Sequence, residues 1–158
     1  EQGKIFLPQL IQTAGVAQAA FEVIKTTLIQ RDAAPVSRGE VVLATVKGDI
    51  HDIGKNIVRV LLENYGYTVL DLGKDVPCQL VADTAKEHNV KLVVLSALMT
   101  TTLGAMEETI QLVKAACPDC KVVVGGAVLT ADYAEKIGAD FYAKDAMETV
   151  AVAKQIVG

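Results

Sequence analysis

The chain has 158 residues, 51% of them hydrophobic and none of them tryptophan, and a formal net charge of −4 from 15 Lys and Arg against 19 Asp and Glu. This length suits one domain with a small appendage, and the apolar fraction excludes a disordered chain. Mild acidity without a run of Lys and Arg argues against nucleic-acid binding. No stretch approaches the roughly 20 apolar residues of a membrane span, no signal peptide is apparent, and three cysteines form no disulfide framework, so we expect a cytoplasmic protein.

The first part of the chain has the periodicity of a helix. Between residues 5 and 30 apolar side chains recur every three or four positions, at Leu7, Leu10, Ala14, Ala17, Phe21, Ile24 and Leu28. A single helix cannot bury such a stripe, so it needs a partner surface. The polar segment that follows, RDAAPVSRG, contains Pro and Gly and is predicted to be a linker, at 33–39.

From residue 40 onward short β-branched runs alternate with helical segments. The predicted strands are Val41–Val46, Tyr67–Leu72, Leu92–Leu95, Val122–Val124 and Asp140–Ala143. The predicted helices are Asn56–Tyr65, Gln79–His88, Leu103–Ala116, Ala131–Ile137 and Ala146–Val157. Five such units predict an α/β fold, a doubly wound five-stranded parallel sheet, for which we favour the flavodoxin-like strand order. Ligands of such sheets bind outside the carboxyl ends of the strands.

The loop after the first strand carries the most informative residues, in the string KGDIHDIGKN. Asp49 stands two residues before His51, where a carboxylate can hold one ring nitrogen and leave the other free for a metal or a proton. Gly54 permits the close approach of a large group at the start of a helix. No further ligands for zinc are nearby, so a metal that brings its own chelate fits better. A solvated or helix-capping histidine is the structural alternative.

Several strings together resemble the cobalamin-binding domain of cobalamin-dependent methionine synthase, in the corrinoid methyltransferase family. The signature is Asp49-x-His51-x-x-Gly54 within VKGDIHDIGKNIV, followed by LSALMTTT (Leu95–Thr102) at the end of strand three and VGGA (Val124–Ala127) at the end of strand four. The segment GKIFLPQLI (Gly3–Ile11) is similar to the end of the helical cap that precedes this domain. The resemblance covers nearly the whole chain.

The resemblance implies a role for each matching residue. His51 would be the lower ligand of the cobalt, Asp49 would hold its far ring nitrogen, and Thr102 would extend this proton relay where methionine synthases often have serine. The displaced nucleotide tail of cobalamin would lie in a slot, where a Cβ on the glycine wall would collide with it. The cofactor-binding set implied is Asp49, His51, Asp52, Gly54, Ser96, Leu98, Thr100, Thr102, Gly125, Gly126 and Leu7. Asp52 is equally explained as loop surface.

The implied function is that of a methyl carrier. The bound cobalamin would cycle between cobalt(I) and methylcobalt(III), moving methyl groups from methyltetrahydrofolate to homocysteine on partner domains, with a reactivation partner; the isolated module would turn over nothing. Residues 1–32 would be a truncated cap, in which Leu7 shields the cofactor without its aromatic companion, and 40–158 the cobalamin-binding domain. The alternative is the corrinoid protein of a methanol or methylamine methyltransferase system; GKIFLPQLI and GGAVLTADYAEKIGADFYAKDA favour methionine synthase.

Three other classes fit less well. A cobalamin-dependent regulator would need a basic DNA-binding segment, a carbon-skeleton mutase lacks a preceding cap, and a phosphorylated signalling domain would need a cluster of acids at the strand ends.

The remaining candidates have plainer explanations. Cys117 and Cys120 are predicted to lie in a simple loop, Cys78 to pack as a small apolar residue, and His88 to end a helix as a structural residue. Asp71, Gly73 and Asp75 are expected on a loop after strand two, as contacts to the corrin amides or as an ordinary turn. Lys47 and Lys55 are expected to meet the tail phosphate or to be solvated.

Overall fold

The computed structural model describes Thr13, Val16 and residues 37–158, and the chain divides into two units at Val36 and Ser37. Thr13 and Val16 are helical and exposed. The rest of the helix predicted between residues 5 and 30, and Leu7 with it, lies outside the described residues. The assignment of residues 1–32 to a cap stays a prediction.

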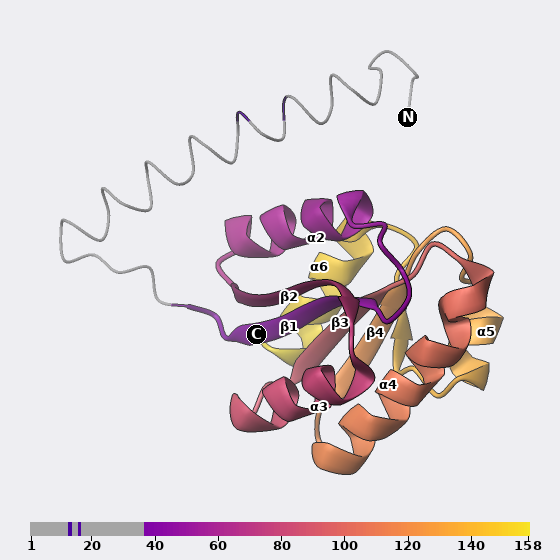
Figure 1. Ribbon diagram of the computed structural model, residues 1–158. Coiled ribbons are helices and arrows are strands. Elements are labelled where there is room, and N and C mark those ends of the chain that lie inside the picture. The colour runs from indigo at the N-terminus through magenta and orange to yellow at the C-terminus, as the bar shows by residue number, and fades with distance from the viewer. Residues whose placement is uncertain (1–12, 14–15, 17–36) are drawn as a thin grey trace, which may run out of the picture. The chain divides into compact units, whose positions relative to one another are not determined.

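Residues 37–158 fold around a single parallel sheet (Figure 1). Its strands are β1 (Glu40–Val46), β2 (Thr68–Val76), β3 (Leu92–Ser96), β4 (Lys121–Gly125) and β5 (Phe141–Tyr142), in the order β2-β1-β3-β4-β5. This confirms the flavodoxin-like order. The chain leaves β1 toward β2 on one side and returns to β3 on the other, so the carboxyl ends of β1 and β3 form the switch point where ligands of such sheets bind.

Helices cover both faces of the sheet. They are α2 (Ile53–Asn64), α3 (Cys78–Glu87), α4 (Leu103–Ala116), α5 (Ala131–Lys136) and α6 (Ala146–Ile156), with a short 3-10 helix η1 (Thr100–Thr102) before α4. In Figure 1, α2 and α6 lie on one face, and α3, α4 and α5 on the other. Among the described residues no helix combines the length and the apolar character needed to cross a bilayer.

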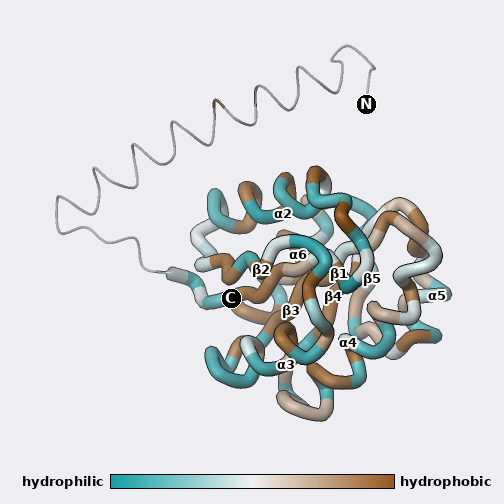
Figure 2. Tube along the Cα trace, viewed as in Figure 1, coloured by the Kyte–Doolittle hydropathy of each residue, from teal (hydrophilic) through white to brown (hydrophobic). Residues whose placement is uncertain are grey.

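The continuous apolar strands are explained by this double cover. Val42 and Ala44 of β1 pack toward α3 and α4, whereas Val41 and Leu43 pack toward α2 and α6, and all four are fully buried. Figure 2 shows the consequence, with hydrophobic residues along the strands and hydrophilic ones on the outer sides of the helices. A parallel sheet covered on both faces requires such apolar runs rather than alternation.

The second strand differs from the prediction in a way that matters for the site. It runs to Val76 instead of Leu72, so Asp71, Gly73 and Asp75 lie within β2 and the loop predicted for them was wrong. Its pairing with β1 shifts register twice, and each shift inserts an extra residue into β2. Polar residues in this part of β2 interrupt the hydrophobic pattern, so the pattern did not predict the strand beyond Leu72. At the other edge β5 is shorter than predicted, with only Phe141 and Tyr142 paired.

Candidate functional site

A tight turn at the end of β1 sets the geometry of the site. The N–H of Asp49 donates to the carbonyl of Val46 over 3.0 Å, and Gly48 between them has φ +83°. This left-handed value at the third turn position is that of a type II turn, which glycine adopts without steric cost. The turn directs Asp49 into the protein, where it has no exposed surface, while the His51 side chain stays 48% exposed.

The Asp49 carboxylate is the centre of a dense hydrogen-bond network. Its Oδ1 accepts from Nδ1 of His51 at 2.7 Å and from the His51 backbone N–H at 3.0 Å. Its Oδ2 accepts the backbone N–H groups of Leu98 at 2.6 Å and Met99 at 3.2 Å, which follow β3. Asp49 therefore joins the loop after β1 to the loop after β3, across the switch point.

This network decides which group carries the proton. Burial by itself raises the pKa of Asp49, but the donors from His51, Leu98 and Met99 outweigh burial and lower that pKa to about 2. The carboxylate is consequently ionised at neutral pH and accepts the Nδ1–H of His51. In the neutral ring Nε2 then keeps its lone pair, which is the form that binds a metal.

Thr102 is brought to Asp49 but has a second partner. Its hydroxyl donates to the carbonyl of Met99 at 2.8 Å and lies 3.3 Å from Oδ2 of Asp49. One hydroxyl has a single proton to donate, so the shorter bond to Met99 takes most of it. The three side chains of the expected relay, His51, Asp49 and Thr102, therefore lie in contact, with the contact of Thr102 the longer one.

A buried hydroxyl that the sequence reasoning missed stands beside this network. Thr45, the penultimate residue of β1, is fully buried and its hydroxyl lies 3.1 Å from that of Ser96 at the end of β3. The Thr45 hydroxyl also donates to the carbonyl of His51 at 3.3 Å. A single threonine in an otherwise apolar buried strand was the signal that could have revealed it.

The two glycines at the end of β4 have a different explanation from the expected one. A Cβ on Gly126, whose φ is +137°, would overlap the carbonyl oxygen of Ala97, and one on Gly125 would come within 2.9 Å of the Ala143 carbonyl. The expectation that a Cβ would collide with the cofactor tail is therefore not needed to explain them. The close approach of the chain's own strand ends already requires both glycines.

Gly54, by contrast, is not required by the fold. It lies in the first turn of α2, has no positive φ, and a Cβ there would meet no atom within 4 Å. Large apolar side chains are exposed next to it, with Ile50 63%, Ile53 55% and Leu98 40% accessible. An open glycine among exposed apolar groups beside a histidine fits a large, partly apolar ligand that brings the metal with it.

Asp52 before α2 and Lys55 in its first turn differ in burial and in partners. Asp52 is partly exposed, makes no side-chain capping bond to α2, and has Oδ2 4.0 Å from Nζ of Lys74. Lys55 is only 3% exposed and its Nζ donates to both carboxylate oxygens of Asp71, at 2.6 and 2.7 Å. The expectation that Lys55 is solvated was wrong, because this ion pair buries the side chain and ties the first turn of α2 to β2; its contact with the tail phosphate stays a prediction.

The remaining His, Cys, Asp and Glu side chains of the described residues form no cluster suited to a metal. No group of three or more His, Cys, Asp or Glu side chains suited to hold a metal occurs in the described part of the chain. Cys78, Cys117 and Cys120 are free thiols; Cys78 and Cys120 are buried, and burial raises the pKa of Cys120 to about 12. A thiol with so high a pKa is unreactive.

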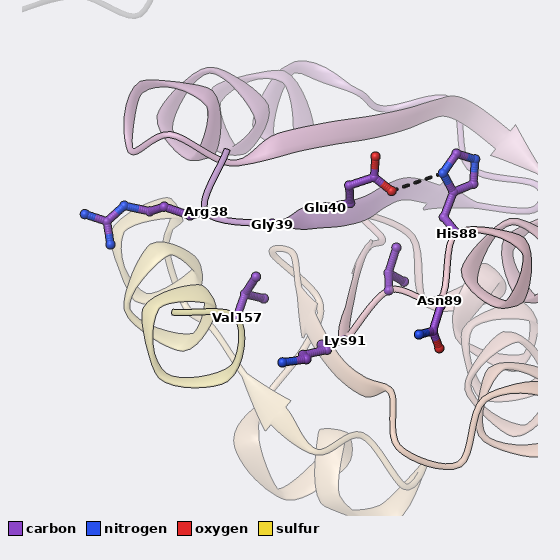
Figure 3. A pocket seen from close by; sticks show the side chains of 8 residues that line it. Arg38, Gly39, Glu40, His88, Asn89, Lys91 and Val157 are labelled. Carbon is purple, nitrogen blue, oxygen red and sulfur yellow. Dashed lines mark hydrogen bonds and ion pairs between the residues drawn. The ribbon is translucent and has the colours of Figure 1, made fainter. Parts of the chain in front are cut away.

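A shallow pocket lies at the opposite edge of the sheet, where β1 begins (Figure 3). Its wall includes Arg38, Glu40, Lys91 and Val157. His88, at the end of α3, has Nδ1 3.1 Å from Oε2 of Glu40. Both members of this pair are over a third exposed. The pocket is separate from the loop of His51, at the amino ends of the strands.

Comparison with known proteins agrees with this arrangement. The family model described as B12 binding domain matches residues 39–151. Dimethylamine corrinoid protein 1 of Methanosarcina acetivorans is 43% identical over 159 aligned positions, which cover 99% of this chain and 74% of that protein.

Solved structures give the same result. A cobalamin-binding protein from Desulfitobacterium hafniense superposes with a TM-score of 0.79 at 37% identity, over 99% of this chain and 73% of its own. The methanol:cobalamin methyltransferase complex MtaBC of Methanosarcina barkeri contains a chain that matches with a TM-score of 0.84 at 33% identity, over 99% of this chain and 59% of its own.

These relatives correct the more specific expectation. One is a corrinoid protein named for dimethylamine, one is a cobalamin-binding protein and one belongs to a methanol:cobalamin methyltransferase complex, and none of these comparisons supports methionine synthase. The similarity of GKIFLPQLI to the methionine synthase cap was therefore not specific to that enzyme. Together with dimethylamine corrinoid protein 1, the chain belongs to the B12-binding domain family.

Proposed function

We propose that this protein binds cobalamin with His51 as the lower ligand of the cobalt and carries methyl groups within a methylamine methyltransferase system. One observation carries the proposal: His51 is half exposed, and its Nδ1 is fixed at 2.7 Å by a carboxylate that is itself completely buried. When bound, cobalamin would supply the cobalt atom that accepts and gives up the methyl group.

The residues of the chain would contribute binding, orientation and control of a proton. Asp49 keeps the Nδ1–H tautomer of His51, so that Nε2 would be the nitrogen free to bind the metal. The N–H groups of Leu98 and Met99 hold Asp49 in the ionised state. Thr102 can add a further donor to the same carboxylate when its bond to Met99 is given up.

The tail of the cofactor would be held by the ends of β3 and β4. Ser96 offers a hydroxyl there, oriented by Thr45, and Leu98 and Thr100 are exposed after the strand. The paired glycines Gly125 and Gly126 add no side chain to the same edge of the sheet, so backbone rather than side chains would line that wall. The roles of Asp52 and Leu7 also remain proposals.

The identity of the relatives favours a methylamine as the methyl donor to this carrier. The partner would then be a methyltransferase subunit that binds the amine, in place of the folate and homocysteine domains first expected. The exposed Ile50, Ile53 and Leu98 lie at the edge where such a subunit must reach the metal. A methanol-specific partner is the second candidate, because of the similarity to a chain of the MtaBC complex.

The binding proposal can be tested with ¹⁵N-labelled protein loaded with hydroxocobalamin, desalted and reduced to the cobalt(II) state. In the electron paramagnetic resonance spectrum, the unpaired electron of cobalt(II) couples to the axial nitrogen. A ¹⁵N ligand therefore splits each line into a doublet, whereas the unlabelled benzimidazole of the cofactor splits it into a triplet. We expect the doublet in the parent protein and in His88→Ala, and its loss in His51→Ala. A triplet or no retained cobalamin in the parent protein would contradict the proposal.

The donor can be tested separately. Methylation of the reduced, cobalamin-loaded protein is followed by its visible spectrum in the presence of a dimethylamine, trimethylamine or methanol methyltransferase subunit and the matching substrate. We expect methylation with an amine system and none with methyltetrahydrofolate and a folate-binding domain. Methylation from methyltetrahydrofolate alone would return the assignment to methionine synthase.

A further inference from the structure

Near the end of β2, Asp75 has a strained backbone and no role in the proposed binding of the cofactor. Asp75 has φ +53°, and Asn89 is the one other non-glycine residue with a positive φ in the described part of the chain. This left-handed conformation costs a non-glycine residue free energy, although Asp tolerates it better than most. Strained residues concentrate where function over-determines the backbone.

Asp75 holds the turn after β1 through its side-chain carboxylate and through its backbone N–H. Its Oδ1 accepts the N–H of Gly48 at 2.7 Å, and its own N–H donates to the carbonyl of Asp49 at 2.9 Å. The Gly48 N–H belongs to the central peptide of the type II turn. It takes no part in the hydrogen bond of the turn itself. Asp75 is thus hydrogen-bonded to the backbone of both Gly48 and Asp49.

The bulges of β2 explain how Asp75 reaches this position. Between the pairs Ala44↔Gly73 and Val46↔Val76, β2 advances by one residue more than β1. An extra residue of this kind bends the strand and redirects a side chain. Gly73, with φ +91°, supplies the first left-handed position of the irregular stretch and Asp75 the second.

The turn is consequently held from two neighbouring strands. From β3, the N–H groups of Leu98 and Met99 hold the side chain of Asp49. From β2, Asp75 holds its backbone. Two anchors on opposite sides leave the carboxylate little freedom to rotate, and the position of the His51 ring follows from that carboxylate.

We propose that Asp75 is a positioning residue that fixes the turn of Asp49, and through it the direction in which His51 presents Nε2 to the cobalt. The inference rests on the proposed function, in which His51 is the cobalt ligand. Asp75 does not itself touch the cofactor in this proposal.

The test uses variants that tolerate a positive φ, so that neither substitution adds backbone strain at this position. Asp75→Gly removes the acceptor, and Asp75→Asn retains an oxygen that can accept the Gly48 N–H. Asp140→Ala is the matched control, because Asp140 also accepts a backbone N–H, that of Val122 at 2.9 Å, at the opposite edge of the sheet. Each ¹⁵N-labelled variant is loaded with hydroxocobalamin, reduced and examined for the ¹⁵N doublet.

We expect Asp75→Gly to shift the balance from the doublet toward unligated or benzimidazole-ligated cobalt by about fivefold, the effect of one lost hydrogen bond. Asp75→Asn should restore the doublet, and Asp140→Ala should keep it while lowering stability. In the cobalamin-free protein, the Gly48 amide should exchange with solvent faster in Asp75→Gly than in Asp75→Asn.

The outcomes separate this inference from the proposed function. A doublet of parental intensity in Asp75→Gly, with the parent protein itself showing the doublet, overturns the positioning role and leaves His51 as ligand. Loss of the doublet in Asp140→Ala as well as Asp75→Gly also overturns it, because general destabilisation then explains the effect. The absence of a doublet in the parent protein contradicts the proposed function instead.

Discussion

The two histidines of the chain are both paired with a carboxylate, at opposite edges of the same sheet. At the carboxyl edge Nδ1 of His51 lies 2.7 Å from a completely buried Asp49, and at the amino edge Nδ1 of His88 lies 3.1 Å from Glu40, which is 42% exposed. Water competes for the second pair but not for the first. A histidine next to an acid therefore indicates little by itself; what distinguishes the first pair is that the fold surrounds its acid with donors.

The largest difference between the pairs should appear when the acids are removed. Asp49→Ala leaves the N–H groups of Leu98 and Met99 without their acceptor in a buried place, and should lower the free energy of unfolding by about 4 kcal/mol. Glu40→Ala removes an exposed pair and should cost at most about 1 kcal/mol. Urea denaturation of both cobalamin-free variants measures the two values. Equal losses would mean that Asp49 contributes no more to the fold than a surface acid.

The sequence predicted the elements and the strand order well, because hydrophobic periodicity records which face of each helix and strand is buried. The resemblance also pointed to Asp49, His51 and Thr102, and the structure brings Thr102 to Asp49 across 53 positions of sequence. The prediction failed at β2, where bulges and polar side chains break the apolar pattern. Lys55 was misjudged for a related reason, since a buried lysine depends on a partner in another strand that no local pattern identifies.

The glycines at the carboxyl edge allow the needs of the fold to be separated from those of the ligand. Gly126→Ala would place a methyl group against the Ala97 carbonyl at a φ that alanine avoids, and should lower stability by about 3 kcal/mol. Gly54→Ala meets no neighbour in a helix and should leave stability equal or up to about 1 kcal/mol higher.

Gly54→Ala should nevertheless affect the binding of cobalamin. Gly54→Ala places its methyl group where the proposed ligand lies, and should weaken retention of cobalamin without loss of fold. Thermal unfolding of the cobalamin-free proteins and cobalamin retention after desalting provide the two readings. Undiminished retention by Gly54→Ala would remove Gly54 from the site.

The smallest effect expected is a pH dependence at the amino edge, where Asp140 has a role comparable to that of Asp49 but in a more accessible place. Burial raises the pKa of Asp140, but the Val122 N–H, Lys114 and Lys121 together lower it by more than burial raises it. The pKa is therefore below its ordinary value. A carboxyl with a lowered pKa binds fewer protons in the folded state than in the unfolded state. Its stabilisation is therefore fully present above the unfolded pKa of about 3.9 and is lost as the pH falls through the folded value.

Asp140→Asn removes this contribution, and the difference in stability between parent and variant isolates it from that of Asp49, which titrates in both proteins. The difference in urea midpoint should be constant from neutral pH down to about pH 5, and should shrink on further acidification. Because Asn can still accept the Val122 N–H, the part of the difference that remains in acid reports that hydrogen bond alone. A difference that stays constant on acidification would mean that the fold does not shift the pKa of this carboxyl, and the amino edge would then resemble a solvated surface; a difference that grows would mean that burial outweighs the Val122 N–H and the two lysines.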